Sequence, residues 1–316
     1  MIVTVTLNPC RDKTQIIEHF TYGGMNRVVE SRQDLGGKGI NVSVALAGLR
    51  VPSICLGFNF ERDADELVRT INKYGIKDDF ILSPGGIRVN TKVFERDTSV
   101  MTEINEKGDF VPQSLFEALK SKVARYSTQV DVIVFSGSAP KGITEECYAE
   151  LIACARSNAI SNNPNIKIIL DAEGSLLNNG LKAKPDIIKP NIFELETFTG
   201  VSLNSFEIIL VKCREIISQY GVRIICVSMG DKGAVIAEAE RAYFAPPLPL
   251  KVRGLQGAGD SMVAGICLSI IEDKPISEIL RYAVTAASAS VEREGTLLCT
   301  KEDFDRIYPH VSIQEI

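Results

Sequence analysis

Hydrophobic and polar positions follow two different patterns along the chain. From about position 130 onward, short β-branched and apolar runs alternate with longer segments of helical spacing. The apolar runs predict buried parallel strands at 130–137, 166–174, 186–191 and 222–230. Segments between them, such as 144–160 and 205–221, predict amphipathic helices. This repetition predicts a three-layer α/β/α fold with a mostly parallel central sheet.

The first third of the chain differs, because its short strand-like runs are separated by turns rather than helices. Those runs are at 15–24, 25–34, 86–95 and 99–108. They predict a small β-sheet that covers the ligand edge of the main sheet as a lid. This lid is expected to be discontinuous, formed by about 13–35 and 86–105. Helices are expected near 38–50 and 63–75, and residues 1–316 are expected to form one domain.

The charge and composition narrow the classes of partner. A net charge of −5 and a pI near 5.4 argue against binding to nucleic acid or to an anionic membrane surface. The start of the chain lacks the features of a signal peptide, and the apolar run around 262–271 is too short to span a membrane. A cytoplasmic protein is therefore expected. Two histidines and the lack of any C-x-x-C spacing argue against a zinc site.

Two glycine-containing motifs precede predicted helices. GGKGINV (36–42) is not a Walker A loop, because Gly39 stands where that loop has Ser or Thr after the lysine. GAGD (257–260) does not complete a dinucleotide fingerprint. A helix that opens on glycines leaves its first N–H groups free to bind an anion. By this reasoning Asp260 is either a helix cap or a base beside a bound phosphate.

These two motifs, with others between them, resemble those of the ribokinase-like (PfkB-type) carbohydrate kinases. The resemblance covers nearly the whole chain, and the further motifs occur in order: TLNPCRD (6–12), NRV (26–28), GIRVNTK (86–92), TEIN (102–105), SGSAPKG (136–142), ILDAEG (169–174), IKPNIFELE (188–196) and VSMGDKGA (227–234). Within the family the chain looks most like the branch that contains 1-phosphofructokinase and tagatose-6-phosphate kinase. The resemblance implies a ribokinase-like fold.

The resemblance also implies roles for particular residues. Asp260 would be the catalytic base, and an anion hole for the γ-phosphate would be formed by Gly257, Ala258 and Gly259. Substrate-binding roles are implied for Asp12, Gly37, Lys38, Asn41, Arg88, Lys92 and Ser138. Nucleotide-binding roles are implied for Lys189, Asn191, Ser228, Gly230 and Gly233. Glu194 would hold magnesium indirectly, through water, although Asn191 and Glu194 also have the spacing of a helix capping box.

The implied activity is phosphorylation of a sugar phosphate by ATP with Mg²⁺. GIRVNTK and GAGDSMVAG favour fructose 1-phosphate as substrate and fructose 1,6-bisphosphate as product. Tagatose 6-phosphate or another sugar remains an alternative substrate, and a non-catalytic regulator that binds sugar phosphate or nucleotide is the alternative from a different class. Asp260 is expected to have an ordinary carboxyl pKa, about 3.9. The family analogy makes a homodimer plausible.

Three places depart from the family pattern. Asn59 to Asp63 replace a glycine-rich turn near the sugar, and Arg11 is expected to add a positive charge beside the sugar site. Leu255 and Gln256 precede GAGD, which is expected to remove a hydroxyl group from the nucleotide side.

Overall fold

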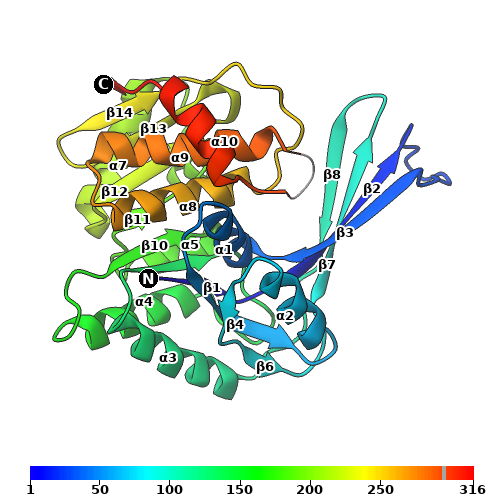
Figure 1. The fold of residues 1–316 in the computed structure, drawn as a ribbon, viewed down its shortest axis with the longest axis horizontal. Coiled ribbons are helices and arrows are strands. Elements are labelled where there is room, and N and C mark those ends of the chain that lie inside the picture. Colours follow the sequence, from blue (N-terminus) through cyan, green and yellow to red (C-terminus); the bar gives the residue numbers. More distant parts are fainter. Residues whose placement is uncertain (294–296) are drawn as a thin grey trace.

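The predicted central sheet is present in the computed structural model of the chain, which describes residues 1–293 and 297–316 (Figure 1). The strand order is β15-β14-β13-β12-β11-β10-β9-β1-β4-β5, with β6 also paired to β4. The strands are parallel from β12 to β5, and β13, β14 and β15 are antiparallel additions. Their bounds are β1 Ile2–Thr6, β4 Ser53–Phe60, β5 Lys77–Asp78, β6 Ile81–Ser83, β9 Val132–Ser136, β10 Lys167–Asp171, β11 Ile187–Ile188, β12 Ile224–Ser228, β13 Ala234–Ala237, β14 Ala242–Ala245 and β15 Gln314–Glu315.

Helices cover both faces of this sheet, which confirms the three-layer prediction. One apolar core is shared with α1, α8, α9 and α10, and the other with the helices from α2 to α7. The helix bounds are α1 Lys38–Gly48, α2 Ala64–Asn72, α3 Gln113–Ser127, α4 Cys147–Ala159, α5 Gly174–Leu181, α6 Ile192–Thr199, α7 Phe206–Tyr220, α8 Ala258–Ile271, α9 Ile276–Val291 and α10 Lys301–Ile307. Two short 3₁₀ helices are η1 Gly230–Lys232 and η2 Tyr308–His310. Within the described residues, no helix combines the length and the apolar character that crossing a membrane requires.

The helix ends follow from local sequence signals. The hydroxyl of Ser205 caps α7 by accepting a hydrogen bond from the Ile208 N–H, and Gly221 ends the helix in a left-handed conformation. Every residue of α8 from Asp260 to Ser269 is buried. An acidic side chain therefore lies at the start of a helix that is otherwise enclosed by the core.

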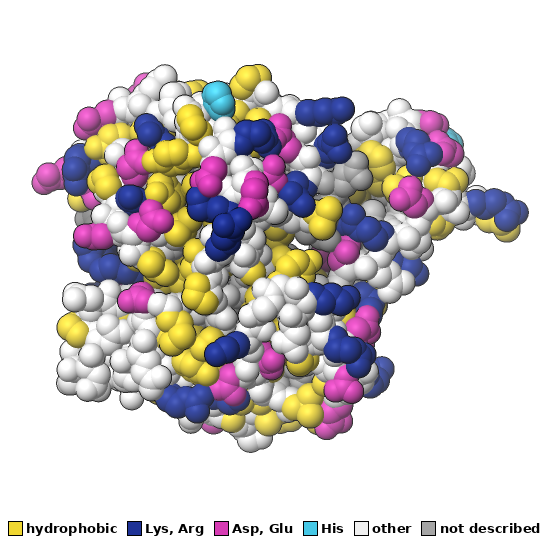
Figure 2. All heavy atoms as spheres, viewed as in Figure 1, with side chains coloured by type: hydrophobic (Ala, Val, Ile, Leu, Met, Phe, Trp, Pro, Cys, Tyr) yellow, Lys and Arg dark blue, Asp and Glu magenta, His cyan; other side chains and the backbone are white. Residues whose placement is uncertain are grey.

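The predicted second sheet is also present, as four strands in the order β3-β2-β7-β8. Their bounds are β2 Cys10–Ile17, β3 Glu30–Gly36, β7 Arg88–Glu95 and β8 Val100–Asn105. Strands β2 and β7 pair in parallel, and the outer strands pair antiparallel to them. This lid sheet projects from the body of the molecule as an arm (Figures 1 and 2). Only the inner end of the arm is therefore close to the main sheet.

Candidate active site

The carboxyl ends of four neighbouring strands supply polar side chains at one edge of the main sheet. Ser136 ends β9, Asp171 ends β10 and Lys189 follows β11. Asn191 forms an isolated bridge with Ser228, the last residue of β12. Ligands bind at this edge in parallel α/β sheets. The strand order therefore brings together residues that are far apart in the sequence.

The first turn of α8 faces this edge and carries the predicted anion hole. Gly257 precedes the helix with a φ of 75°, a left-handed conformation that favours glycine. Ala258 and Gly259 form the start of the helix without a side-chain cap. The Ala258 N–H donates to the Leu255 carbonyl over a long 3.4 Å, whereas within the described residues the Gly259 N–H has no such backbone partner and can meet a ligand. A methyl group in place of the Gly259 hydrogen would lie 3.5 Å from the Lys189 ammonium nitrogen. The helix start and Lys189 are therefore close neighbours.

Asp260 lies in this first turn and is 8% exposed. Its Oδ2 accepts a hydrogen bond from Asn41 Nδ2 at 2.8 Å, which joins the starts of α1 and α8. Burial raises the pKa of Asp260 to about 6, with a further contribution from the negative charge of Asp171. The hydrogen bond from Asn41 and the charges of two lysines oppose this shift. The expectation of an ordinary pKa was wrong, because it took no account of burial beside a second carboxylate.

Asp171 is a second buried carboxylate, and the sequence analysis assigned it no role. Its Oδ1 is 3.3 Å from Lys189 Nζ, and its Oδ2 accepts a hydrogen bond from the Ser136 hydroxyl at 2.9 Å. Burial tends to raise the pKa of Asp171, but Lys189, Lys38 and the Ser136 hydroxyl together hold it below its usual value. The sequence signal that could have identified Asp171 was its position near the end of a predicted buried strand. Asn191 was identified at the end of another predicted strand.

Lys38 joins the two sides of the site. It was expected in the sugar loop, but its ammonium group lies 3.8 Å from the Glu194 carboxylate, on the expected nucleotide side. The negative charge of Asp171, and then those of Glu194 and Asp260, outweigh the effect of burial and raise the pKa of Lys38. Lys38 is therefore a cation that interacts with three carboxylates of the site. Its positive charge would also attract a phosphate group bound between them.

Asn191 and Glu194 form the capping box that their spacing indicated. The Asn191 side chain accepts from the Glu194 N–H, and the Glu194 side chain accepts from the Asn191 N–H, both at 2.8 Å. This cap uses one Glu194 oxygen and leaves the other directed toward Lys38. Within the described residues, no group of three or more His, Cys, Asp or Glu side chains is arranged to bind a metal ion directly. The oxygen donors present fit a magnesium ion that keeps its water ligands.

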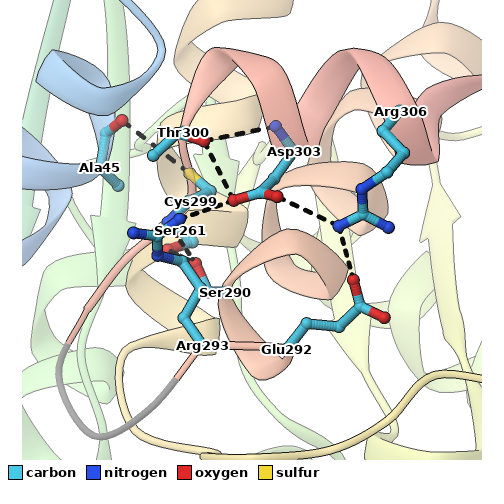
Figure 3. A network of polar contacts seen from close by, with 9 residues as sticks. All are labelled: Ala45, Ser261, Ser290, Glu292, Arg293, Cys299, Thr300, Asp303 and Arg306. Carbon is cyan, nitrogen blue, oxygen red and sulfur yellow. Dashed lines mark hydrogen bonds and ion pairs between the residues drawn. The ribbon is translucent and has the colours of Figure 1, made fainter.

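A polar network joins α8 to α9 and to the segment before α10 (Figure 3). The Ser290 hydroxyl donates to the Ser261 hydroxyl at 2.6 Å and accepts from the Cys299 N–H at 2.8 Å. Arg293 donates to Asp303 at 2.7 Å, which fixes the end of α9 to α10 (Figure 3). Because Ser261 follows Asp260 directly, this network fixes the first turn of α8 against α9.

The lid contributes a second acidic centre at Asp12. Lys92 Nζ is 3.3 Å from its Oδ2, and Asn90 Nδ2 donates to its Oδ1 at 3.2 Å. Gln256, from the loop before α8, donates to the same Oδ2 at 2.6 Å. Asn90 and Gln256 are contacts that the sequence analysis missed, although Asn90 lies between Arg88 and Lys92 on the same face of β7.

Arg88 and Lys92 lie on one face of β7 as expected but have different partners. Lys92 pairs with Asp12, whereas Arg88 Nη1 donates to the Glu106 carbonyl at 2.8 Å. Among the described residues, the buried Arg88 Nε has no hydrogen-bond partner. Arg88 lines a cavity of about 590 Å³ at the foot of the lid, together with Lys107 and Lys141.

The remaining predicted residues lie in loops around the site. The Ser138 hydroxyl is 3.2 Å from Asn8 Nδ2, which also donates to the carbonyl groups of Lys107 and Ala139. Gly37 precedes α1, and Gly230 and Gly233 flank the turn at η1 after β12. Gly37, Gly230 and Gly233 have positive φ, so each permits a turn at the sheet edge.

Arg11 and Gln256, at two of the expected departures, make contacts that the sequence analysis did not predict. Arg11 lies on the opposite face of β2 from Asp12 and contacts Asp63 at 3.0 Å and Glu66 at 2.8 Å. It also lines the cavity that contains Arg88. The Gln256 side chain reaches Asp12, so the segment before α8 contacts the lid.

The unusual segment 59–63 connects the lid to the main sheet. The Asp63 side chain accepts hydrogen bonds from Arg11 at 3.0 Å and from the Ile87 N–H at 2.8 Å. Arg62 donates to Asp109 at 2.7 Å, while the Asn59 side chain is buried and bonds to the Ala64 carbonyl. The charged side chains that replace the glycines therefore hold the starts of β2 and β7 against α2.

Comparisons with known proteins agree with this geometry. The sequence profile described as pfkB family carbohydrate kinase matches residues 4–303. The 1-phosphofructokinase of Bacillus subtilis is 32% identical over 317 residues and aligns over 100% of both chains. The tetrameric inhibited form of phosphofructokinase-2 from Escherichia coli is 26% identical, with a TM-score of 0.86 and 98% of each chain covered. Ribokinase from Arabidopsis thaliana is 20% identical, covers 97% of this chain and 98% of its own with a TM-score of 0.77, and supports the ribokinase-like fold.

Proposed function

We propose, because the chain belongs to the pfkB family of carbohydrate kinases, that it transfers the γ-phosphoryl group of ATP to the 6-hydroxyl group of fructose 1-phosphate. The product would be fructose 1,6-bisphosphate. The observation that carries this proposal is the buried Asp260 in the first turn of α8, which has no side-chain cap and whose preceding loop contacts the lid through Gln256 and Asp12. We take residues 1–316 as one kinase domain, with the lid strands closing over the sugar.

The chemistry assigns a separate task to each end of the site. Asp260 accepts the proton of the sugar hydroxyl as the new O–P bond forms, and the bond between the γ-phosphorus and the bridging oxygen breaks. The electron pair of that bond leaves with ADP. The N–H groups from Gly257 to Gly259 stabilise the charge on the transferred group. With a pKa of about 6, Asp260 is ionised near neutral pH yet more basic than an ordinary aspartate.

The nucleotide side is assigned to the strand ends. Lys38 and Lys189 offer positive charge to the phosphate groups, and the turn from Ser228 to Gly233 lies where the nucleotide would extend. Glu194 would hold a magnesium ion through water. That ion neutralises phosphate charge when it is bound.

The sugar side is assigned to the lid and the loops below it. Asp12, with Asn41 and Gly37, would bind sugar hydroxyl groups. Arg88 would bind the existing phosphate, since its Nε is without a partner among the described residues and its cavity also contains Lys107 and Lys141. Ser138 would donate to the same phosphate from the loop after β9.

The outer part of the lid is assigned to a second copy of the chain. Its exposed apolar residues include Tyr22, Met25, Val100, Met101 and Ile104. Figure 2 shows hydrophobic side chains on this arm, where water surrounds it in a single copy. A homodimer would cover them, and the tetrameric form of the Escherichia coli relative is consistent with association. A kinase that uses ATP and a phosphorylated sugar is expected in the cytoplasm, where both are held.

Release of ADP from Mg-ATP tests the activity across fructose 1-phosphate, tagatose 6-phosphate, fructose 6-phosphate, fructose and ribose. We expect the highest kcat/KM with fructose 1-phosphate. An Arg88→Ala variant should raise KM for the sugar phosphate by about tenfold or more and leave KM for a neutral sugar nearly unchanged. Preference for another sugar would keep the mechanism and change the substrate. Lack of turnover with every sugar, despite binding, would favour a regulatory role.

A further inference from the structure

A hydrogen bond joins the lid to the loop that begins α8. Gln256 Nε2 lies 2.6 Å from Asp12 Oδ2, although the two residues are 244 positions apart. Gln256 directly precedes Gly257, and Asp12 lies on β2. The contact therefore crosses from the part of the site assigned to the γ-phosphate to the part assigned to the sugar.

The Asp12 carboxylate is held on both oxygens. Gln256 and Lys92 contact Oδ2 at 2.6 Å and 3.3 Å, and Asn90 donates to Oδ1 at 3.2 Å. The Cys10 thiol, on the same strand, also donates weakly to Oδ1 at 3.6 Å. These donors fix the orientation of the carboxylate, whose oxygens together have about four acceptor positions. Gln256 makes the shortest of these contacts, and among the described residues it alone comes from outside the lid sheet.

The Gln256 side chain is not needed to form the start of the helix. Backbone bonds close that turn, from Ala258 N–H to the Leu255 carbonyl at 3.4 Å and from Ser261 N–H to the Gly257 carbonyl at 2.8 Å. The neighbouring Leu255 side chain is 75% exposed. The two adjacent side chains thus have different surroundings: Leu255 is in solvent, and Gln256 contacts the lid.

We infer that Gln256 is a positioning residue for sugar binding, which orients the Asp12 carboxylate and couples the lid to the glycine loop of α8. This inference rests on the proposed function, since Asp12 is assigned to the sugar there. Loss of the carboxamide leaves Asp12 with donors from the lid sheet alone, so its carboxylate can turn away from the sugar. The nucleotide side lacks this contact and should be little affected.

The test compares Gln256→Leu with the wild type and with Leu255→Ala, a matched change in the same loop. Calorimetric titration with fructose 1-phosphate alone measures sugar binding without nucleotide, and steady-state kinetics separate KM from kcat. We expect Gln256→Leu to weaken sugar binding and raise its KM about tenfold, with KM for ATP and kcat within about threefold. Leu255→Ala should behave as the wild type.

A double-mutant cycle with Asp12→Ala distinguishes positioning from a general disturbance, because alanine removes both acceptor oxygens. If Gln256 acts through Asp12, Gln256→Leu should change sugar affinity by less than about twofold in the Asp12→Ala background. Equal losses for sugar and ATP, independent effects of the two substitutions, or tighter sugar binding by Gln256→Leu would each overturn the inference. If wild type binds another sugar of the panel instead, the proposed substrate is wrong, and the same cycle is measured with that sugar.

Discussion

Asp171 and Asp260, the two carboxylates at the centre of the site, are both buried, yet their surroundings shift their pKa values in opposite directions. Asp171 lies beside Lys189 and the Ser136 hydroxyl, so its pKa is lowered despite burial. Asp260 has a hydrogen bond from Asn41 but, within the described residues, no ammonium group at ion-pair distance, and its pKa rises to about 6. The donor groups around a buried acid, rather than its burial alone, therefore decide whether it is a fixed anion or a base.

The largest expected effect concerns the base. Asp260→Asn removes the group that accepts the proton and should lower kcat by about 10²- to 10⁴-fold, the usual contribution of general base catalysis. ATP binding, measured by titration, should remain within a few-fold of the wild type. Retention of substantial turnover would show that Asp260 is not the base.

The equivalent change at Asp171 should act on stability first. Asp171→Asn leaves the buried Lys189 ammonium without its counterion and should reduce the free energy of unfolding by about 3–5 kcal/mol. Urea unfolding followed by circular dichroism measures this change. Unfolding at the wild-type urea midpoint would contradict the view that Asp171 is a fixed anion.

The pH dependence of the free energy of unfolding should also distinguish Asp260 from Asp171. Its folded-state pKa of about 6 exceeds the unfolded value, so its contribution is fully present below about pH 4 and is lost as pH rises through 6. At about 1.4 kcal/mol for each pKa unit, the ionised carboxylate costs about 3 kcal/mol at neutral pH. Asp260→Asn should therefore be more stable than the wild type at pH 7. Equal stability of the two proteins at pH 4 and at pH 7 would contradict the raised pKa.

The smallest expected effect comes from the hydrogen bond to Asn41. Asn41→Leu removes a donor that favours the ionised form of Asp260, so the pKa of Asp260 should rise further. A bond worth about 1 kcal/mol corresponds to a shift of about 0.7 pKa units. The acidic limb of the profile of kcat/KM against pH should move upward by that amount. An unchanged limb would mean that Asn41 does not set the basicity of Asp260.

Much of the architecture could be predicted from the chain, because it depends on local patterns. The buried strands, a helix over 205–221 and the lid sheet were all indicated by the periodicity of the apolar positions. The family motifs also placed Asp260 and Lys189 correctly at one sheet edge. Side-chain contacts between distant segments, such as that of Asp12 with Gln256, could not be predicted, because no spacing rule links positions that are 244 residues apart.

The contacts of Arg11 could be predicted only in part. Alternation along β2 places Arg11 on the face opposite its neighbour Asp12, but its partners Asp63 and Glu66 come from a separate segment of the chain. The raised pKa of Asp260 needed the structure, since burial and the distance to Asp171 are properties of the assembled core.

The central position of β1 has a consequence for synthesis on the ribosome. β1 lies between β4 and β9, so its pairing can be complete once residues up to Ser136 have emerged. Helices α8 and α9, which cover one face of that sheet, are made more than a hundred residues later (Figure 1). During that interval apolar residues such as Ile2, Val132 and Val134 lack their final cover. The growing chain therefore carries a half-covered sheet, a surface suited to transient protection by chaperones until α8 arrives with Asp260.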